Sequence, residues 1–305
     1  MKNSHRVVCA GICLGTLLLA IVAPAKSGKP KQTQGASAQK ATLEVLKPRL
    51  EAIAGKLQGN TGIAVEDLNS GERFSIEGGK SFVQASSIKI AILVSLLRDD
   101  QQGKLHLGDS IAIHRADFVG GSGVLQYFNG ESDSLSLHDL AVLMIVLSDN
   151  SATNYVIDRE TIAHVNATMD ELGYKTTRLN RRMMDAVAQR EGRENLSTPD
   201  EMSALLDALH KGKLLDAGHT KMAIDILQIP KDTPLGRGLP ASQPHADKPG
   251  VLPGVRTDSG IVPLAGRPYV LSVMINRAAD ENAAEKSIEE ISRATYEYFR
   301  SLPKN

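Results

Sequence analysis

Apolar residues recur at spacings of three and four in several separate stretches of the chain. Leu43, Leu46, Leu50 and Ile53 begin the first stretch, and this spacing is typical of one face of an amphipathic helix. Patterns of this kind predict helices over 43–57, 87–97, 137–147, 152–172, 199–209 and 283–298. We also expect Ser197 or Thr198 near the N-cap of the helix over 199–209.

Short apolar runs bounded by turn residues predict strands near both ends of the globular part. They cover 62–67 and 72–76, joined as a hairpin by a turn at 69–71, and later 260–264 and 269–275. The intervening stretch 103–137 is rich in loop residues. Early and late strands must pair to bury their apolar faces. We therefore predict an α+β fold, in which one antiparallel sheet is flanked by the terminal helices. An inserted all-helical lobe leaves a cleft, a usual place for a small-molecule site.

Residues 1–25 have the pattern of a secretory signal. A basic start is followed by an apolar run over 7–22, and Ala23 and Ala25 supply the small residues that precede a cleavage site. The alternative is a membrane anchor, because the run is close to the ~17 residues that a span needs. The small-residue site favours cleavage after Ala25, so we expect a secreted or periplasmic protein. The polar stretch 26–40 is predicted to be a flexible linker, and 41–305 to form the globular domain.

Composition removes several classes of function. Both cysteines, Cys9 and Cys13, lie in the predicted leader, so the mature chain offers no thiol chemistry. Lysine plus arginine and aspartate plus glutamate number 35 each, which leaves no basic footprint for a nucleic acid. The eight histidines form no H-E-x-x-H motif or paired cluster. We expect no metal, no cofactor and no nucleic-acid partner, and we expect a monomer.

Ser86 and Lys89 are the first candidates for chemistry. They form the pattern S-x-x-K at the start of a predicted helix, where residues three apart share a face and backbone N–H groups favour developing negative charge. A desolvated lysine beside another cation can lose its proton and act as a base. The pattern alone is weak, because Ser37 and Lys40 repeat it in the linker. Taken alone, Ser86 is more simply an ordinary helix cap.

Two later motifs change that interpretation. Ser148-Asp149-Asn150 follows the helix over 137–147, and Lys248-Pro249-Gly250 precedes the late strands. Each has a simple local explanation: Asp149 is a good N-cap, and Pro-Gly is a turn dipeptide. The combination S-x-x-K, S-D-N and K-T-G, however, is the signature of class A β-lactamases and penicillin-binding proteins.

The chain resembles this family over 41–302. Four further segments are similar to family segments: 119–125 before S-D-N, 178–181 and 197–199 at the two ends of an Ω-shaped loop, and 254–260 as the turn after the K-T-G strand. The resemblance implies the catalytic residues Ser86 as nucleophile, Lys89 as its base or a member of the proton relay, and Ser148 as the proton carrier to the leaving nitrogen. Asp149 is expected to be a buried structural acceptor.

The resemblance also implies a set of substrate-binding residues. Asn150 is expected to bind the substrate side-chain carbonyl. Gly250 and Val251 are expected to contact the substrate, and the N–H groups of Ser86 and Val251 are expected to form the oxyanion hole. Lys248 and Arg256 are expected to hold the substrate carboxylate.

Two departures from the family pattern bear on activity. The glutamate that activates water in class A β-lactamases falls on Met183, and its asparagine partner falls on Val187. Asp185 is the nearest acid, and either a helix cap or a replacement base accounts for it. Pro249 replaces the threonine or serine whose hydroxyl touches the substrate carboxylate. A proline is tolerated in a strand only where its N–H is not needed.

These observations predict a serine hydrolase that is acylated at Ser86 by β-lactams and hydrolyses the ring, with the acyl-enzyme persisting for lack of a base. The substrate is expected to be a β-lactam or a D-alanyl-D-alanine peptide. Two alternatives remain open at this point. One is a D-alanyl-D-alanine carboxypeptidase acting on peptidoglycan, and the other is a binding protein without turnover.

Overall fold

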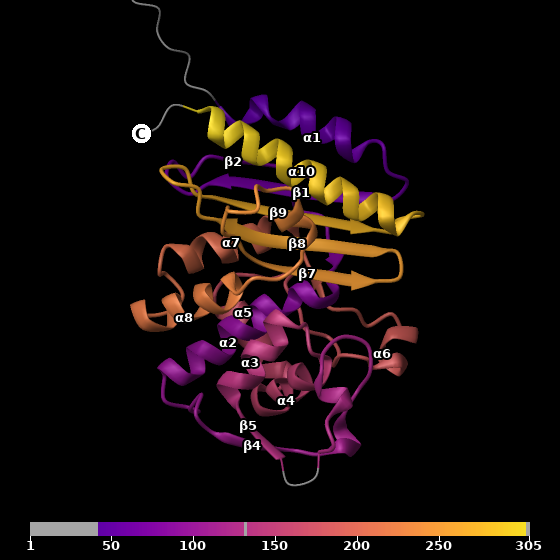
Figure 1. Ribbon diagram of the computed structural model, residues 1–305, viewed down its shortest axis with the longest axis vertical. Coiled ribbons are helices and arrows are strands. Elements are labelled where there is room, and N and C mark those ends of the chain that lie inside the picture. The colour runs from indigo at the N-terminus through magenta and orange to yellow at the C-terminus, as the bar shows by residue number, and fades with distance from the viewer. Residues whose placement is uncertain (1–41, 131–132, 303–305) are drawn as a thin grey trace, which may run out of the picture. The chain divides into compact units, whose positions relative to one another are not determined.

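The computed structural model describes residues 42–130 and 133–302, which belong to one compact unit, Ala41–Asn305 (Figure 1). The predicted leader and linker over 1–40 lie outside the described residues. Of the helices in those two ranges, none combines the length and apolar character that crossing a bilayer requires.

A five-stranded antiparallel sheet joins the two ends of this unit (Figure 1). Its strands follow the order β2-β1-β9-β8-β7, so that the first strand lies against the last along its whole length. The bounds are β1 Asn60–Asp67, β2 Arg73–Ile76, β7 Ala246–Leu252, β8 Val255–Val262 and β9 Tyr269–Asn276. The predicted pairing of early with late strands is confirmed, and so is the α+β class. The segment expected to be a turn over 254–260 instead forms most of β8.

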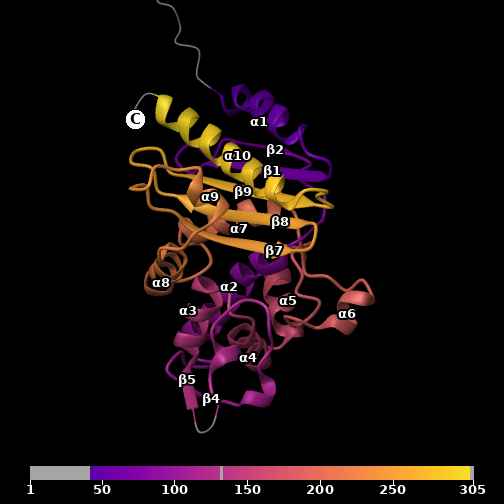
Figure 2. The same ribbon diagram turned by 45° about the vertical axis from the view of Figure 1, so that its right-hand side comes forward.

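The terminal helices cover one face of this sheet (Figure 2). They are α1 Lys47–Ala54, preceded by the short helix η1 Leu43–Val45, and α10 Glu281–Ser301. Their apolar sides and the facing strand residues form one hydrophobic core, in which the rings of Tyr269 and Phe299 stack with centroids 4.4 Å apart. This core accounts for the apolar periodicity at both ends of the chain.

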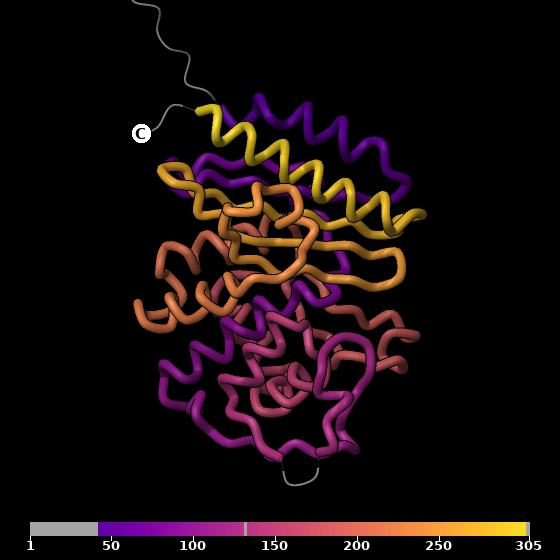
Figure 3. Tube along the Cα trace, in the orientation of Figure 1, coloured from indigo at the N-terminus to yellow at the C-terminus, as the bar shows by residue number. Residues whose placement is uncertain are grey.

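The middle of the chain forms the helical lobe and then returns to the sheet at β7 (Figure 3). Its longer helices are α2 Lys89–Gln101, α3 Leu137–Val146, α4 Asn150–Glu160, α5 Ile162–Glu171, α7 Pro199–His210 and α8 Ala217–Gln228. Helix α2 is central, since every residue from Lys89 to Leu97 is buried. Helix α7 packs on β1, β8 and β9, and a second core links the lobe to this face of the sheet.

Shorter elements fill the connections. They are η2 Ala85–Ile88, η3 Arg115–Asp117, η4 Leu125–Tyr127, α6 Ala186–Arg190, α9 Pro234–Arg237, the pair β3 Phe82–Val83 and β6 Leu196–Ser197, and the pair β4 Ser110–Ile113 and β5 Asp133–Ser136. The last pair is a hairpin inside the stretch that was predicted to be mainly loop. The predicted helix over 152–172 is broken at Thr161, whose φ of 65° ends α4 and whose hydroxyl caps α5. Thr198 caps α7, as predicted.

Candidate active site

Ser86 lies in η2, directly before α2, beside the edge of the sheet. Gly250 of β7 sets this closeness: a Cβ there would lie 2.4 Å from Gln84 O and 3.0 Å from Ser86 N. Only glycine allows two backbones to approach so closely. The hydroxyl of Thr257 ties η2 to β8, because it donates to Gln84 O and lies 2.7 Å from Ser87 Oγ. The nucleophile candidate is therefore held against the strand expected to bind substrate.

Lys89 is the first residue of α2 and is completely buried. Its ammonium donates to Ser148 O at 2.8 Å, to Ser148 Oγ at 3.2 Å and to Asn150 Oδ1 at 3.2 Å. Burial, and next the charge of Lys248, hold the pKa of Lys89 well below its ordinary value. Both causes disfavour the protonated amine, which is the condition for a lysine to act as a base.

The S-D-N motif sits where α3 gives way to α4. Asp149 accepts hydrogen bonds from three backbone N–H groups: Val124 at 2.6 Å, and Leu125 and Ala152 at 2.9 Å. This arrangement confirms that Asp149 is a buried structural acceptor and the N-cap of α4. It also fixes the loop before the motif, so that Asn150 Nδ2 donates to Gly120 O at 3.0 Å while its Oδ1 faces Lys89.

Backbone strain gathers around these residues. Among the described residues, six other than glycine have a positive φ, and three of them lie at this site: Ala85 at 48°, Ser148 at 52° and Met184 at 61°. Each such conformation costs on the order of 1–3 kcal/mol and persists only where the surroundings impose it, most often at functional sites. Ala85 immediately precedes Ser86, so the strain turns the nucleophile candidate toward the cavity.

Strand β7 presents a free edge to the site. It pairs only with β8, at the end of the sheet. Pro249 has no N–H, so it fits an edge strand only where its nitrogen points away from β8. Residues two apart share this direction, and the N–H of Val251 therefore points to the same open edge, next to Ser86. Val251 is itself 56 % exposed. The predicted oxyanion-hole pair is compatible with this geometry.

Lys248 lies behind this edge, almost wholly buried, and its ammonium donates to Pro249 O at 3.0 Å. Burial lowers its pKa to about 8, against the opposing effect of the carboxylates of Asp258 and Asp247. At pH 7 it is therefore mostly a cation, close enough to act on Lys89.

Arg256, predicted to hold the substrate carboxylate, has its guanidinium engaged by other groups. Its guanidinium donates to Glu285 at 2.9 Å, to Glu281 at 2.7 Å, and to the carbonyls of Leu252 and Val255 at 3.0 and 2.9 Å. The physical reason is strand parity: Thr257 faces η2, so its neighbour Arg256 faces α10 on the other side of the sheet. Arg256 therefore contacts α10, and Lys248 keeps its predicted role at the substrate carboxylate.

A cavity of ≈ 330 Å³ brings the distant segments together. Ser86, Asn150, Met183 and Val251 all contribute to its wall, although they come from four separate parts of the chain. Lys89 and Ser148 are linked to it through Asn150. The cavity is large enough for a small bicyclic or dipeptide substrate.

The loop over 178–198 forms the floor of this cavity. Its neck is closed by the Arg181–Glu194 ion pair at 2.8 Å and by Asn195 Oδ1, which accepts from the N–H groups of Asn180 and Arg181. Met183 is buried and lines the cavity, and Asn154 holds its backbone by two hydrogen bonds: Asn154 Oδ1 accepts from the N–H of Met183, and Asn154 Nδ2 donates to its carbonyl. The apolar side chain therefore occupies the place where the family pattern has a carboxylate.

Asp185 is engaged elsewhere in the loop. Its carboxylate accepts from Ala188 N at 2.9 Å and caps α6. The cap interpretation is thus the one that the geometry supports. Val187 is exposed, with 55 % of its surface accessible, and supplies no amide.

Comparisons with known proteins agree with this arrangement. Residues 45–299 match the model of the β-lactamase enzyme family. The chain belongs to this family. β-Lactamase CARB-4 of Pseudomonas aeruginosa is 27% identical over 82% of this chain and 89% of its own length, and ROB-1 of Haemophilus influenzae is 26% identical over 96% and 98%. The match to CARB-3 of Pseudomonas aeruginosa, 27% identical, spans 56% of this chain and only 60% of that protein.

Solved structures of the family share the fold. A β-lactamase from Sphaerobacter thermophilus superposes with a TM-score of 0.79 at 28% identity, over 86% of this chain and all of the other. PBP-A superposes with a TM-score of 0.79 at 26% identity, over 86% and 98%. An ancestral class A β-lactamase of Gram-negative bacteria gives 0.77 at 27% identity, over 83% and 99%. The chain therefore has the fold of the class A β-lactamases and PBP-A and is a serine β-lactamase-like hydrolase.

Within this family framework, several cavity residues were not predicted. Ser122 accepts from Asn150 N at 3.1 Å through its carbonyl, and Met184, Gln189 and Pro253 complete the wall. Ser122 lies in the segment 119–125, so that its resemblance to the family was a usable signal. Gln189 lies in α6, a helix of five residues without apolar periodicity, and had no such signal.

Proposed function

We propose that the chain is a secreted serine hydrolase that β-lactams acylate at Ser86 and that hydrolyses the resulting ester slowly. The observation that carries this proposal is the junction of Lys89 with Ser148 and Asn150 beside the cavity that holds Ser86. Secretion rests on the leader pattern of residues 1–25.

Acylation follows from the properties of these groups. Neutral Lys89 removes the proton from Ser86 Oγ, which attacks the carbonyl carbon of the β-lactam. The N–H groups of Ser86 and Val251 stabilise the oxyanion, which is the largest electrostatic contribution in this type of reaction. When the C–N bond breaks, Ser148 passes its proton to the leaving nitrogen, and Lys89, 3.2 Å from Ser148 Oγ, returns a proton to Ser148. Lys248 attracts the substrate carboxylate.

Deacylation lacks an evident base in this geometry. The side chain at position 183 is a buried thioether, and the carboxylate of Asp185 caps α6. A positioned base contributes about 10²–10⁴ to a rate, so water attack on the ester is expected to be slow.

The peptidase alternative has specific support. PBP-A superposes as well as the β-lactamase of Sphaerobacter thermophilus does, and a leucine-to-glutamate variant of PBP-A has been solved as an acyl-enzyme complex with penicillin G, with a TM-score of 0.78 to this chain. Together with Met183, this likeness supports a D-alanyl-D-alanine carboxypeptidase as the second candidate.

We expect Ser86→Ala to abolish covalent labelling by a fluorescent penicillin, whereas Ser37→Ala, which alters the repeated motif in the linker, leaves it unchanged. Intact-mass spectrometry after mixing with penicillin G measures the adduct over time. A persistent adduct supports slow turnover, and release of a D-alanine residue from a D-alanyl-D-alanine peptide supports the peptidase. Labelling that survives in Ser86→Ala would remove the assignment.

A further inference from the structure

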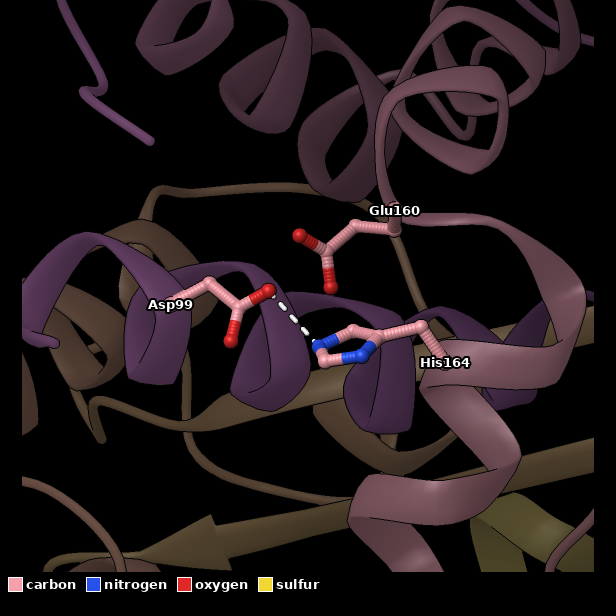
Figure 4. A group of neighbouring side chains, drawn as sticks. All are labelled: Asp99, Glu160 and His164. Atoms are coloured by element: carbon pink, nitrogen blue, oxygen red, sulfur yellow. Dashed lines mark ion pairs between the residues drawn. The ribbon is translucent and has the colours of Figure 1, made fainter. Parts of the chain in front are cut away.

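A second group of chemically active side chains lies in the helical lobe, apart from the cavity at Ser86. Asp99 near the end of α2, Glu160 at the end of α4 and His164 in α5 converge, as Figure 4 shows. One ligand atom from each residue lies within 4.8 Å of the other two. Asp99 and Glu160 are 6 % and 3 % exposed. The sequence predicted no metal site, because Asp99 lies some sixty residues before its partners.

Two atoms of this group have unmet bonding capacity. Glu160 Oε1 and His164 Nε2 are both buried, and neither has a hydrogen-bond partner among the described residues. Nε2 lies 2.7 Å from Asp99 Oδ2, but without the direction of a hydrogen bond. Buried polar atoms in native proteins nearly always have a hydrogen-bond partner. Two buried atoms that lack such a partner and face the same point therefore favour a bound group between them.

The remaining oxygen of each carboxylate is already held. Ser95 donates to Glu160 Oε2 at 2.5 Å, and Lys104 donates to Asp99 Oδ1 at 3.0 Å. This leaves Glu160 Oε1 and Asp99 Oδ2 facing His164 Nε2. Outer hydrogen bonds that orient ligating carboxylates in this way are characteristic of metal sites.

Charge also favours a cation. Asp99 and Glu160 place two buried carboxylates close together. Within the two described ranges, Lys104 is the one lysine or arginine that forms an ion pair with either carboxylate, and its side chain is 52 % exposed. A divalent ion would neutralise both.

We propose that Asp99, Glu160 and His164 bind one Zn²⁺ ion, with water as the fourth ligand. Imidazole and carboxylate ligands suit Zn²⁺, which takes four ligands at about 2.0–2.2 Å, whereas Mg²⁺ and Ca²⁺ require six or more oxygen ligands. Ligand atoms around tetrahedral zinc lie about 3.3 Å apart, so binding opens the short Nε2–Oδ2 approach slightly. The His164 side chain is 33 % exposed, which provides a route of entry from solvent.

The position of the ion suggests a structural role. Helix α2 carries Lys89 at its start and Asp99 ten residues later, and α4 carries Asn150 at its start and Glu160 ten residues later. At about 1.5 Å per residue, the ion is about 15 Å from the catalytic ends of both helices. It joins the far ends of the two helices that hold the proposed active site, and therefore stabilises the lobe without contacting the substrate.

The test is Zn²⁺ binding by the tag-free full chain after removal of metals with a chelator. Isothermal titration calorimetry should show one Zn²⁺ per chain. Thermal unfolding should shift upward by about 5 °C at a hundredfold excess of Zn²⁺ over Kd, and Mg²⁺ should have no effect. Neither readout depends on hydrolase activity.

Three variants make the result specific. His164→Asn and Glu160→Gln should each raise Kd at least tenfold. The partly exposed ring makes His164→Asn the variant least able to disturb folding. His219→Asn is the matched control, because His219 also lies between two aspartates, at 2.9 Å from Asp100 and Asp216, and should keep Kd within twofold. Absence of Zn²⁺ binding, an unchanged Kd in His164→Asn, or an equal response to Mg²⁺ would overturn the proposal.

Discussion

Single residues at the site lie largely where their motifs predicted. Ser86, Asn150 and Val251 share one cavity wall, and Lys89 and Ser148 meet behind it. The motifs were sufficient to place these residues, because each motif lies at the start of a helix or on an edge strand, where local geometry fixes the direction of the side chain. The contacts of Arg256 with α10 were not predictable, because they depend on the face of β8 from which the side chain projects. The apolar pattern placed the start of that strand five residues too late.

At the residue scale, we expect Lys89→Ala to slow acylation by ~10²–10⁴, the usual contribution of a positioned acid or base. The lowered pKa of Lys89 means that the neutral amine is already populated well below pH 10.5. Acylation of the wild type should therefore fall as the pH drops through this pKa, because protonation removes the base. Stopped-flow rates between pH 5 and 9 measure both effects. If Lys89→Ala is acylated within about threefold of the wild-type rate, and its rate falls at low pH in the same way, then another group takes the proton from Ser86.

Arg256→Ala tests whether Arg256 mainly holds α10 or binds the substrate. Losing its bonds to Glu281 and Glu285 detaches α10 from β8, and the side chain is only 8 % exposed. We expect the free energy of unfolding to fall by about 1–2 kcal/mol, the usual size for a partly buried network. Acylation at substrate saturation should change little. Urea denaturation and labelling rates measure the two quantities. The control is Arg49→Ala, which removes an exposed ion pair with Glu297 and should leave stability within about 0.5 kcal/mol. An unchanged stability together with a large rise in KM would restore the substrate-binding role.

At the scale of elements, the terminal helices and the β1–β2 hairpin were predictable because the apolar residues of each follow a single pattern, that of a helix or that of a strand. The β4–β5 hairpin was missed, since two four-residue strands lie inside a loop-rich stretch. The break at Thr161 was also missed, because threonine is not a helix-breaking residue such as proline or glycine, and nothing in the local sequence indicates its φ of 65°. This break turns His164 toward Glu160, and so the metal-site candidate was not predictable from sequence.

The prediction at the scale of elements concerns deacylation and the loop over 178–198. Met183→Glu should speed deacylation, because a carboxylate there faces the cavity that contains Ser86. The gain should be below the 10²–10⁴ of an optimised base, since Val187 offers no amide to hold the water. Decay of the penicillin adduct, followed by intact mass, measures it.

Asp185→Asn is the matched control for that experiment. Asparagine is as good an N-cap as aspartate, so α6 should stay formed while the carboxylate is lost. We expect the adduct of Asp185→Asn to decay at the wild-type rate. A fast wild type whose adduct becomes trapped in Asp185→Asn would identify Asp185 as the base instead.

At the scale of the whole molecule, two hydrophobic cores lie on opposite faces of one sheet, and both consist of residues from Leu43 onward. Because early and late strands pair, the chain closes on itself at the β1–β9 ladder. This closure was predictable from the positions of the strands. Helices α2 and α4 are joined at both ends, by the Lys89–Asn150 contact at one and by Asp99, Glu160 and His164 at the other, and this arrangement was not predictable from the sequence.

This closure predicts where the chain tolerates truncation. A chain that starts at Ala41 keeps every residue of both cores, and we expect its melting temperature and its rate of penicillin labelling to equal those of the chain that starts at Lys26. A chain that starts at Lys47 lacks Leu43 and Leu46, each only 2 % exposed. Losing two buried leucines costs about 2–5 kcal/mol each, so this chain should melt far lower while any folded fraction still labels at Ser86. Differential scanning calorimetry of the three chains decides the matter. A large loss of stability on removing 26–40 alone would show that the linker belongs to the folded unit.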